Sequence, residues 1–111
     1  MSTVYVPQQP SRWDADLSLW IPTMNLRPAE KYGTVSIMLP PNLANAMLAP
    51  LVEALKEKLA TFTRDDCLVA IGDPSLIAAA AGIALKRTGG TLKLLKWDRQ
   101  AKDYICSEIR I

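Results

Sequence analysis

Histidine is absent from the 111 residues, and that absence removes a large group of mechanisms. Imidazole is the general base of Ser–His–Asp triads and the commonest metal ligand in proteins. Only two cysteines are present, Cys67 and Cys106, and we expect both to be buried, reduced thiols that act as small hydrophobic side chains. At the adjacent Asp65 and Asp66 we expect a solvated turn and not a metal site. The sequence therefore predicts a protein that is not an enzyme and that binds no metal or cofactor.

Long hydrophobic runs and secretion signals are absent as well. No apolar stretch reaches the ~18 residues that a membrane-spanning helix needs. The opening from Met1 to Pro7 lacks a basic segment followed by an apolar one, which is the pattern of a secretory signal. We therefore expect a cytoplasmic protein with no membrane partner.

Charged residues are sparse, at 22% of the chain with a net charge of +2, whereas 50% of the residues are hydrophobic. This composition is too apolar and too weakly charged for a disordered chain. The scaling of buried surface with mass allows one hydrophobic core for a chain of this size. We predict a single α/β domain over residues 32–111, preceded by a Pro-rich extended arm over residues 1–31.

Glycine is missing before Gly33, and four of the eight prolines lie at or before residue 28. Because proline lacks an amide donor and fixes φ, the arm is predicted to contain no long helix and no central strand. Thr3–Val6 and Leu17–Ile21 fit short strands, with an edge hairpin through Trp13–Asp16. The arm is nevertheless rich in apolar side chains, so we expect it to pack on its own domain or on a neighbouring subunit.

Residues 32–111 alternate between strand and helix patterns. The predicted elements, in chain order, are strand 34–39, helix 51–62, strand 67–71, helix 75–87, strand 92–97 and strand 104–111. Right-handed crossovers make the first three strands parallel in one sheet, and the last strand pairs antiparallel at its edge. The predicted fold class is α/β: a small three-to-five-stranded, mostly parallel sheet with an antiparallel C-terminal edge hairpin.

The second predicted helix has clear ends. Asp73 fits an N-cap, Pro74 fits the first helical position, and Gly89–Gly90 provides the stop. The helix is Ala-rich and uncharged until Lys86, so we expect it to be covered on nearly every side.

Gly72, Asp73 and Ser75 form the first candidate site. They lie between a buried strand and a helix N-terminus, where open α/β sheets bind ligands and where helix N–H groups favour anions. No Gly-rich phosphate-binding motif accompanies them, Pro74 removes one donor, and the Asp73 carboxylate would repel an anion. A capping turn is the favoured interpretation, and an anion-binding site is the alternative.

The second candidate site is a set of four basic side chains: Lys93, Lys96, Arg99 and Lys102. They belong to residues 85–111, which carry seven positive and three negative side chains, a net charge of +4. Basic side chains near Trp97 and Tyr104 are able to bind a phosphate backbone and stack on bases. Lysines on an edge hairpin also keep it solvated and discourage edge-to-edge pairing. Nucleic-acid binding and a solvated edge are both open interpretations.

Several short segments carry a resemblance to known proteins: Gly72–Ile77, Gly89–Gly90, Leu94–Arg99 with Tyr104 beyond it, and Leu39–Pro40 after a Pro-rich start. Over nearly its whole length, the chain resembles a family of small uncharacterised proteins encoded by tailed bacteriophages. The resemblance implies a phage origin and expression inside an infected bacterium. It implies no catalytic or ligand-binding residue.

Together these features predict a non-catalytic phage accessory protein that acts as a homo-oligomeric binding module in the cytoplasm of an infected bacterium. Tyr5, Trp13 and Trp20 are the predicted oligomer interface, because a tryptophan buries on the order of 200 Å² and is a favoured interface anchor. A host protein or nucleic acid is the predicted further partner. Two alternatives stay open: a virion or assembly component, and a small nucleotide- or anion-binding domain at Gly72–Pro74.

Overall fold

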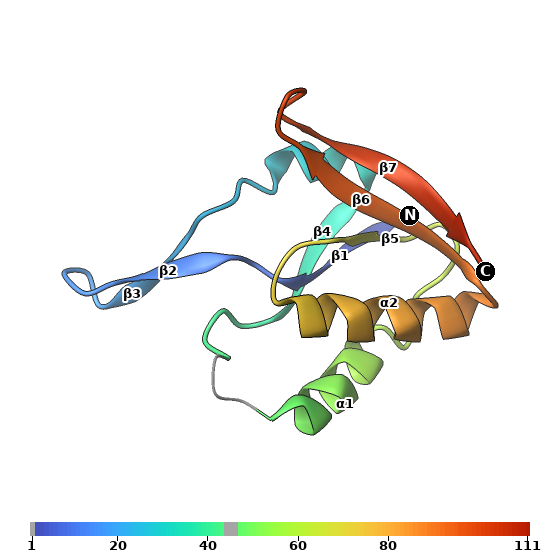
Figure 1. Ribbon diagram of the computed structural model, residues 1–111, viewed down its shortest axis with the longest axis horizontal. Coiled ribbons are helices and arrows are strands. Elements are labelled where there is room, and N and C mark those ends of the chain that lie inside the picture. The colour runs from blue at the N-terminus through green and yellow to red at the C-terminus, as the bar shows by residue number, and fades with distance from the viewer. Residues whose placement is uncertain (1, 44–46) are drawn as a thin grey trace.

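The computed structural model describes residues 2–43 and 47–111, and its centre is a five-stranded sheet (Figure 1). In spatial order the strands are β4 (Thr34–Leu39), β1 (Thr3–Gln8), β5 (Cys67–Val69), β6 (Thr91–Asp98) and β7 (Asp103–Arg110). The first four are parallel, and β7 is antiparallel to β6 at the edge of the sheet. The predicted α/β class, the mostly parallel sheet and the C-terminal edge hairpin are therefore confirmed.

The prediction that the Pro-rich arm contains no central strand was wrong. β1 lies between β4 and β5 and pairs in parallel with both. Val4, Val6 and Pro7 are fully buried in this strand. The sheet tolerates Pro7 because β5 pairs only with Val4 and Tyr5, so no pairing on that side requires a donor from the proline. The first strand thus belongs to the same sheet as the rest of the chain.

Helices α1 (Leu48–Lys58) and α2 (Pro74–Thr88) cover one face of the sheet. The crossovers from β4 to β5 and from β5 to β6 move in the same direction along the sheet, and right-handed crossovers then place both helices on one side. Their apolar side chains form one core cluster with the strands, which includes Tyr5, Leu55, Leu59, Phe62, Leu68, Leu76, Ala80 and Leu92. Both predicted helices are present, although α1 lies a few residues N-terminal to the range that its periodicity predicts.

The ends of α2 agree with the prediction from its sequence. The Asp73 carboxylate accepts a hydrogen bond from the Ser75 amide at 2.8 Å, and Pro74 is the first helical residue. Gly89 ends the helix in the left-handed region, at a φ of 75°. Short-range hydrogen bonds and backbone preferences decide these positions, so they are readable from local sequence.

The covering of α2 is less complete than expected. Leu76, Ala80 and Ala84 are buried against the sheet and α1, but Ala78 and Gly82 are exposed on the outer side. The expectation of cover on nearly every side was wrong for the single chain, because both helices share one layer and no element of the described chain lies outside it.

A short 3-10 helix, η1 (Arg27–Tyr32), lies on the opposite face of the sheet. The chain from β1 to β4 crosses the sheet in the reverse direction, so a right-handed connection lies on the other side. Leu26 and Ala29 there form a second core cluster with buried strand residues, among them Tyr104. The Tyr104 hydroxyl donates to the Asn25 carbonyl at 3.3 Å, which joins this segment to β7.

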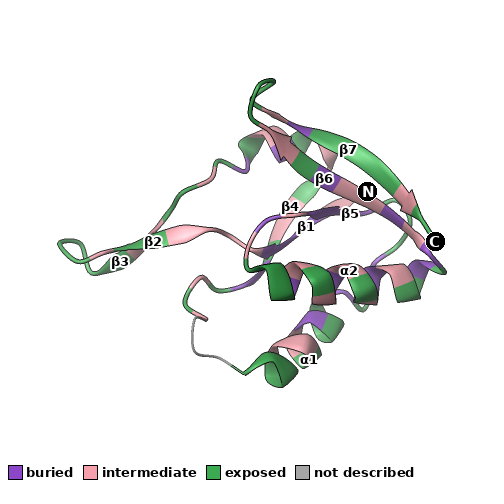
Figure 2. Cartoon of the chain, in the orientation of Figure 1, coloured by how far each residue is buried: buried purple, intermediate pink, exposed green. Residues whose placement is uncertain are grey.

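Strands β2 (Ser11–Asp14) and β3 (Leu19–Pro22) form a separate antiparallel hairpin. It projects from the domain along the 45 Å long axis of the molecule (Figure 1). Figure 2 shows the two strands as exposed and intermediate, whereas the strands of the main sheet contain buried segments. A hairpin is present near the predicted one, but the connection lies at residues 15–18 rather than at Trp13–Asp16, because Trp13 and Asp14 belong to β2. The hairpin is an independent ribbon and not an edge of the sheet.

Two local expectations were wrong. Asp66 is buried rather than solvated, and its carboxylate accepts hydrogen bonds from the amides of Thr3 and Thr63, each at 2.8 Å. This carboxylate ties the start of β1 to the segment before β5, a contact between residues far apart in sequence. Cys106 is exposed on β7, while Cys67 is buried as expected.

Candidate functional site: a projecting hairpin and the cavity at its base

The β2–β3 hairpin carries an aromatic pair on one of its faces. Trp13 lies opposite Trp20, with the ring centroids 5.6 Å apart and the planes at 63°. Trp13 is 50% exposed, and Leu17 and Leu19 near the tip are also exposed. Large apolar side chains thus lie in solvent on an element that has no core of its own.

The hairpin is held at both ends by hydrogen bonds. At the tip, the Asp14 carboxylate accepts from the amides of Asp16 and Leu17, both at 3.0 Å. At the root, the amide and the hydroxyl of Thr23 both donate to the Pro10 carbonyl, at 2.8 and 3.1 Å. The ribbon therefore presents its tryptophan pair on a defined backbone.

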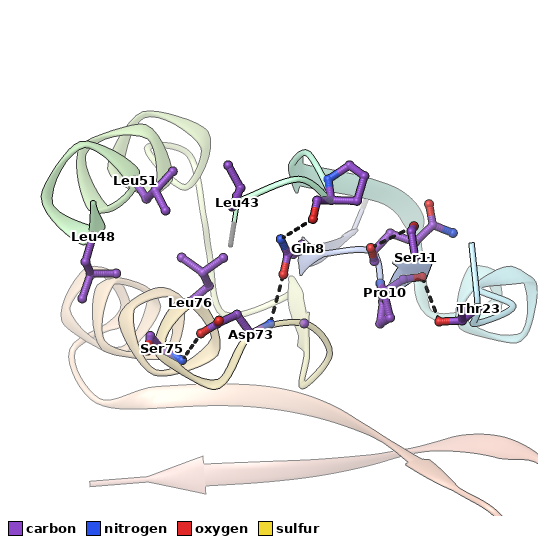
Figure 3. Close-up of a pocket in the computed structure, with 13 residues that line it drawn as sticks. Gln8, Pro10, Ser11, Thr23, Leu43, Leu48, Leu51, Asp73, Ser75 and Leu76 are labelled. Atoms are coloured by element: carbon purple, nitrogen blue, oxygen red, sulfur yellow. Dashed lines mark hydrogen bonds between the residues drawn. The ribbon is translucent and has the colours of Figure 1, made fainter. Parts of the chain in front are cut away.

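A cavity of about 440 Å³ lies at the base of the hairpin (Figure 3). It opens beyond the carboxyl ends of β1 and β5, whose following segments leave toward opposite faces of the sheet. Open α/β sheets bind ligands at such a topological switch point. Its lining residues are Gln8, Gln9, Pro10, Ser11, Thr23, Pro41, Leu43, Leu48, Leu51, Gly72, Asp73, Ser75 and Leu76.

The Gln8 side chain joins the strand ends at the floor of this cavity. Its amide nitrogen donates to the carbonyls of Pro40 and Pro41, at 3.1 and 3.3 Å, and its oxygen accepts from the Asp73 amide at 3.1 Å. Gly72 is required beside it, because a Cβ there would lie 2.9 Å from Gln8 atoms and the φ of Gly72 is 116°. The polar groups of the floor thus bond to one another, whereas the opposite wall is formed by leucines.

The predicted anion site lies on this cavity, since Gly72, Asp73 and Ser75 all line it. The Asp73 carboxylate, however, accepts the hydrogen bond from the Ser75 amide, which a bound anion would otherwise receive. The structure thus brings the three residues together at a cavity and uses them as a helix cap. Anion binding itself stays a prediction.

The four predicted nucleic-acid residues do not share one surface. Lys96 and Arg99 line a separate cavity of about 370 Å³ at the end of β6, and Lys102 lies in the turn that follows. Lys93 is on the opposite face of β6, where it stands across from Glu108 of β7. Three basic side chains therefore gather near the β6–β7 tip, and nucleic-acid binding by them stays a prediction.

The structure separates the three predicted interface residues. Trp13 and Trp20 form the pair on the hairpin, but Tyr5 is buried in the helix-side core, 5.5 Å from the Phe62 ring. Tyr5 faces the core because β1 is a central strand, which the proline content concealed. The Tyr5 side chain is therefore not available as an interface anchor on this chain.

A local sequence repeat connects the two hairpins of the chain. Trp13-Asp14 is followed by Trp20, and Trp97-Asp98 is followed at the same spacing by Tyr104. In both hairpins, the Asp carboxylate accepts hydrogen bonds from two backbone amides of the turn. The residue before the second strand has a positive φ in both, 52° at Ser18 and 51° at Lys102. This spacing is the sequence signal that would have predicted both hairpins together, whereas Gln8 and the cavity leucines have no such signal.

The pKa values that depart from their ordinary range have structural causes. Burial raises the pKa of the Cys67 thiol to about 11, so the thiol stays protonated at neutral pH. Burial also raises the pKa of Tyr104. The contact between Lys31 and Asp103 raises the pKa of the lysine and lowers that of the carboxyl. Over residues 2–43 and 47–111, no three His, Cys, Asp or Glu side chains are grouped as metal ligands.

The family model described as "Phage Pam3 gp32-like protein" matches residues 2–111. No curated protein and no solved structure matches the chain. Within the part of the chain that the structure describes, no helix is long and apolar enough to cross a membrane.

Proposed function

This chain belongs to the Phage Pam3 gp32-like protein family, and from that premise we propose that it is a non-catalytic accessory protein of infection that works by self-association through the β2–β3 hairpin. The expected place of action is the cytoplasm of the infected bacterium. A virion or assembly component is the alternative, which mass spectrometry of purified particles would reveal.

The observation that carries this proposal is the Trp13–Trp20 pair, with Trp13 half exposed and Trp20 partly buried, on a ribbon fixed at its tip and root. An isolated two-stranded hairpin is marginally stable in water, because it buries little apolar surface. Tryptophan on a fixed backbone loses little conformational entropy on binding and is a frequent anchor of protein interfaces. A protein surface that covers the pair would bury the apolar area that the hairpin leaves in solvent, and it would thereby stabilise the hairpin.

Charge favours a protein over nucleic acid as the partner of this hairpin. Residues 11–22 carry one positive side chain, Arg12, and two negative ones, Asp14 and Asp16, a net charge of −1. Phosphate contacts require the opposite balance. Contact with nucleic acid, which we retain as a further role, would instead use Lys96, Arg99 and Lys102, and electrophoretic shifts at two salt concentrations test it.

The proposal is tested by the mass of the protein in solution, measured by multi-angle light scattering over a wide micromolar range. We expect the wild-type chain to be an oligomer at high micromolar concentration and the double variant Trp13→Ser, Trp20→Ser to be a monomer. Ile105→Ser removes an exposed apolar side chain elsewhere and should leave the mass unchanged. A wild-type chain that stays monomeric at the highest concentration would contradict the proposal.

A second candidate function is binding of a small molecule in the cavity at the base of the hairpin. The position at the switch point of the sheet and the volume of about 440 Å³ support it. A thermal shift against a panel of nucleotides and inorganic phosphate tests this candidate, and no shift with any of them would contradict it.

A further inference from the structure

We propose that the cavity at the base of the hairpin receives the β2–β3 hairpin of a second copy, so that two chains clasp each other about a two-fold axis. This inference rests on the proposed self-association and adds where each hairpin binds. The hairpin and the cavity at its base, which lie next to each other on the chain, then belong to one interface.

The wall of the cavity continues into the tryptophan face of the hairpin. Ser11 lines the cavity, and strand alternation places the Ser11 side chain on the same face of the ribbon as Trp13 and, across the pair, Trp20. Figure 3 shows Leu48 and Leu51 on the far side of the cavity from Ser11 and Thr23. The hairpin face and the N-terminal turn of α1 thus border one recess.

Apolar side chains without cover lie on the far wall of this recess and next to it. Leu48 on the wall is 47% exposed, and Met47, which precedes it at the start of α1 and does not line the cavity, is 77% exposed. A hairpin that enters the recess covers these side chains and its own at the same time. Because each chain carries one hairpin and one recess, a two-fold axis satisfies both chains with a self-complementary contact.

The distribution of charge fits this arrangement. The face with Trp13 and Trp20 carries no charged side chain, so two such faces are able to stack without burying an ion. The opposite face carries Arg12 and Asp14, whose side chains form an ion pair at 4.0 Å. This face is neutral as a pair, and in the clasp it turns toward the partner's helix N-termini without bringing net charge against them.

The available apolar area suits a weak dimer. Half-exposed Trp13 offers on the order of 100 Å² for burial. With Leu17, Leu19, Met47 and Leu48 offering comparable areas, two chains together bury on the order of 1,000 Å², near the lower end for a specific interface. We therefore expect a dissociation constant in the micromolar range and a dimer that forms only at high concentration.

The first test compares Leu48→Lys with Ile105→Lys, because Leu48 and Ile105 are matched in exposure at 47% and 48%. We expect Leu48→Lys to raise the dimer dissociation constant at least tenfold, as Trp13→Ser does, and Ile105→Lys to change it less than twofold. If Leu48→Lys lowers the melting temperature of the monomer, Met47→Lys at the more exposed neighbour replaces it. Sedimentation velocity gives the dissociation constants.

The second test is a cross-link between two different chains. A chain with Ala15→Cys at the hairpin tip is mixed with a chain with Met47→Cys, both with Cys106→Ser to remove the exposed thiol. Oxidation should give a disulfide-linked pair, whereas Ala15→Cys mixed with Ala101→Cys in the β6–β7 turn should not.

The outcomes separate this inference from the proposed function. If Trp13→Ser abolishes the dimer while Leu48→Lys and Met47→Lys leave it intact, the hairpin binds elsewhere and only the clasp is overturned. If a nucleotide fills the cavity without changing the mass of the dimer, the clasp is also overturned. If the wild-type chain is monomeric throughout, both proposals are wrong.

Discussion

The two hairpins of this chain share a turn and an aromatic pair, but its own fold covers only one of them. Trp97 and Tyr104 of β6–β7 lie 5.0 Å apart with their planes at 66°, close to the 5.6 Å and 63° of Trp13 and Trp20. Trp97 is partly buried and its partner Tyr104 is 2% exposed, however, while the equivalent Trp13 is 50% exposed and Trp20 is partly buried. The same local structure is therefore part of the core in one place and part of the surface in the other.

The difference comes from what packs on each pair. β6 is hydrogen-bonded to β5, so its hairpin is continuous with the main sheet, and η1 lies on its aromatic face. The Tyr32 hydroxyl donates to the Tyr104 carbonyl at 3.0 Å, which fixes η1 against β7. β2 and β3 pair only with each other, and no element of the described chain packs on Trp13 as η1 packs on Tyr104. Within the described chain, Trp13 therefore lacks the cover that η1 gives Tyr104, and the proposed self-association would supply it.

The largest expected effect separates the two aromatic pairs by stability. Tyr104→Ala should lower the free energy of unfolding by about 3–5 kcal/mol, because it leaves a cavity in the core and removes the bond to Asn25. Trp13→Ala, measured on dilute monomer, should change it by less than about 1 kcal/mol, since the side chain is half exposed. Urea denaturation measures both, and equal losses for the two variants would contradict the comparison.

A smaller effect separates the two turns. Asp98→Ala should cost about 1 kcal/mol of unfolding free energy, because it removes two hydrogen bonds in a hairpin that unfolds with the sheet. Asp14→Ala removes the equivalent bonds in the projecting ribbon. We expect it to leave global unfolding unchanged and to speed amide exchange within residues 11–22 only. Hydrogen exchange by mass spectrometry makes the measurement, and a global loss with Asp14→Ala would show that the ribbon is part of the cooperative core.

The smallest effect is a pH dependence of stability that is confined to the β6–β7 hairpin, which η1 covers. The contact with Lys31 lowers the folded pKa of Asp103. The stability that the ionised Asp103 carboxylate adds to the fold is therefore present above the unfolded pKa of the carboxyl and is lost as pH falls through the folded pKa. The folded pKa of Lys31 is raised, so the stability that the charged lysine adds is lost only as pH rises through that pKa, in the alkaline range above 10.5.

Thermal melting from neutral to acidic pH should therefore show a small extra loss of stability in the wild type. Lys31→Gln should lack that loss, and Lys58→Gln on α1 provides a control for the change in charge. Identical acid profiles for the wild type and Lys31→Gln would contradict the assigned pair.

Much of the fold follows from sequence patterns at short range. The cap at Asp73, the stop at Gly89 and the pairing of β6 with β7 each depend on residues close together in the chain, so their patterns predict them. The tryptophan hairpin is also predictable, because its turn residues and apolar flanks are contiguous. The central place of β1 is not, since Val4 pairs with Val35 on one side and Cys67 on the other.

The candidate site divides in the same way. Trp13, Trp20, Gly72, Asp73 and Ser75 are identifiable from sequence as interface or helix-start residues. The cavity that joins them is not identifiable, because Gln8 meets the Asp73 amide across 65 positions of the chain and Leu48 comes from a third segment. The exposure of Trp13 and the burial of Tyr5 are likewise decided by which strand enters the sheet.

By itself, the sequence determined the α/β class, the ends of α2, the turn of each hairpin and the phage family to which the chain belongs. These properties depend on hydrogen bonds, φ preferences and apolar spacing over a few residues, which a linear pattern records. Only the tertiary structure decided that β1 is central and that the buried Asp66 carboxylate bonds to the start of β1. It also decided that the root of the β2–β3 hairpin meets the N-terminal ends of α1 and α2 at one cavity. The reason is physical: burial and strand pairing depend on the sum of contacts among distant segments, and no local pattern contains that sum.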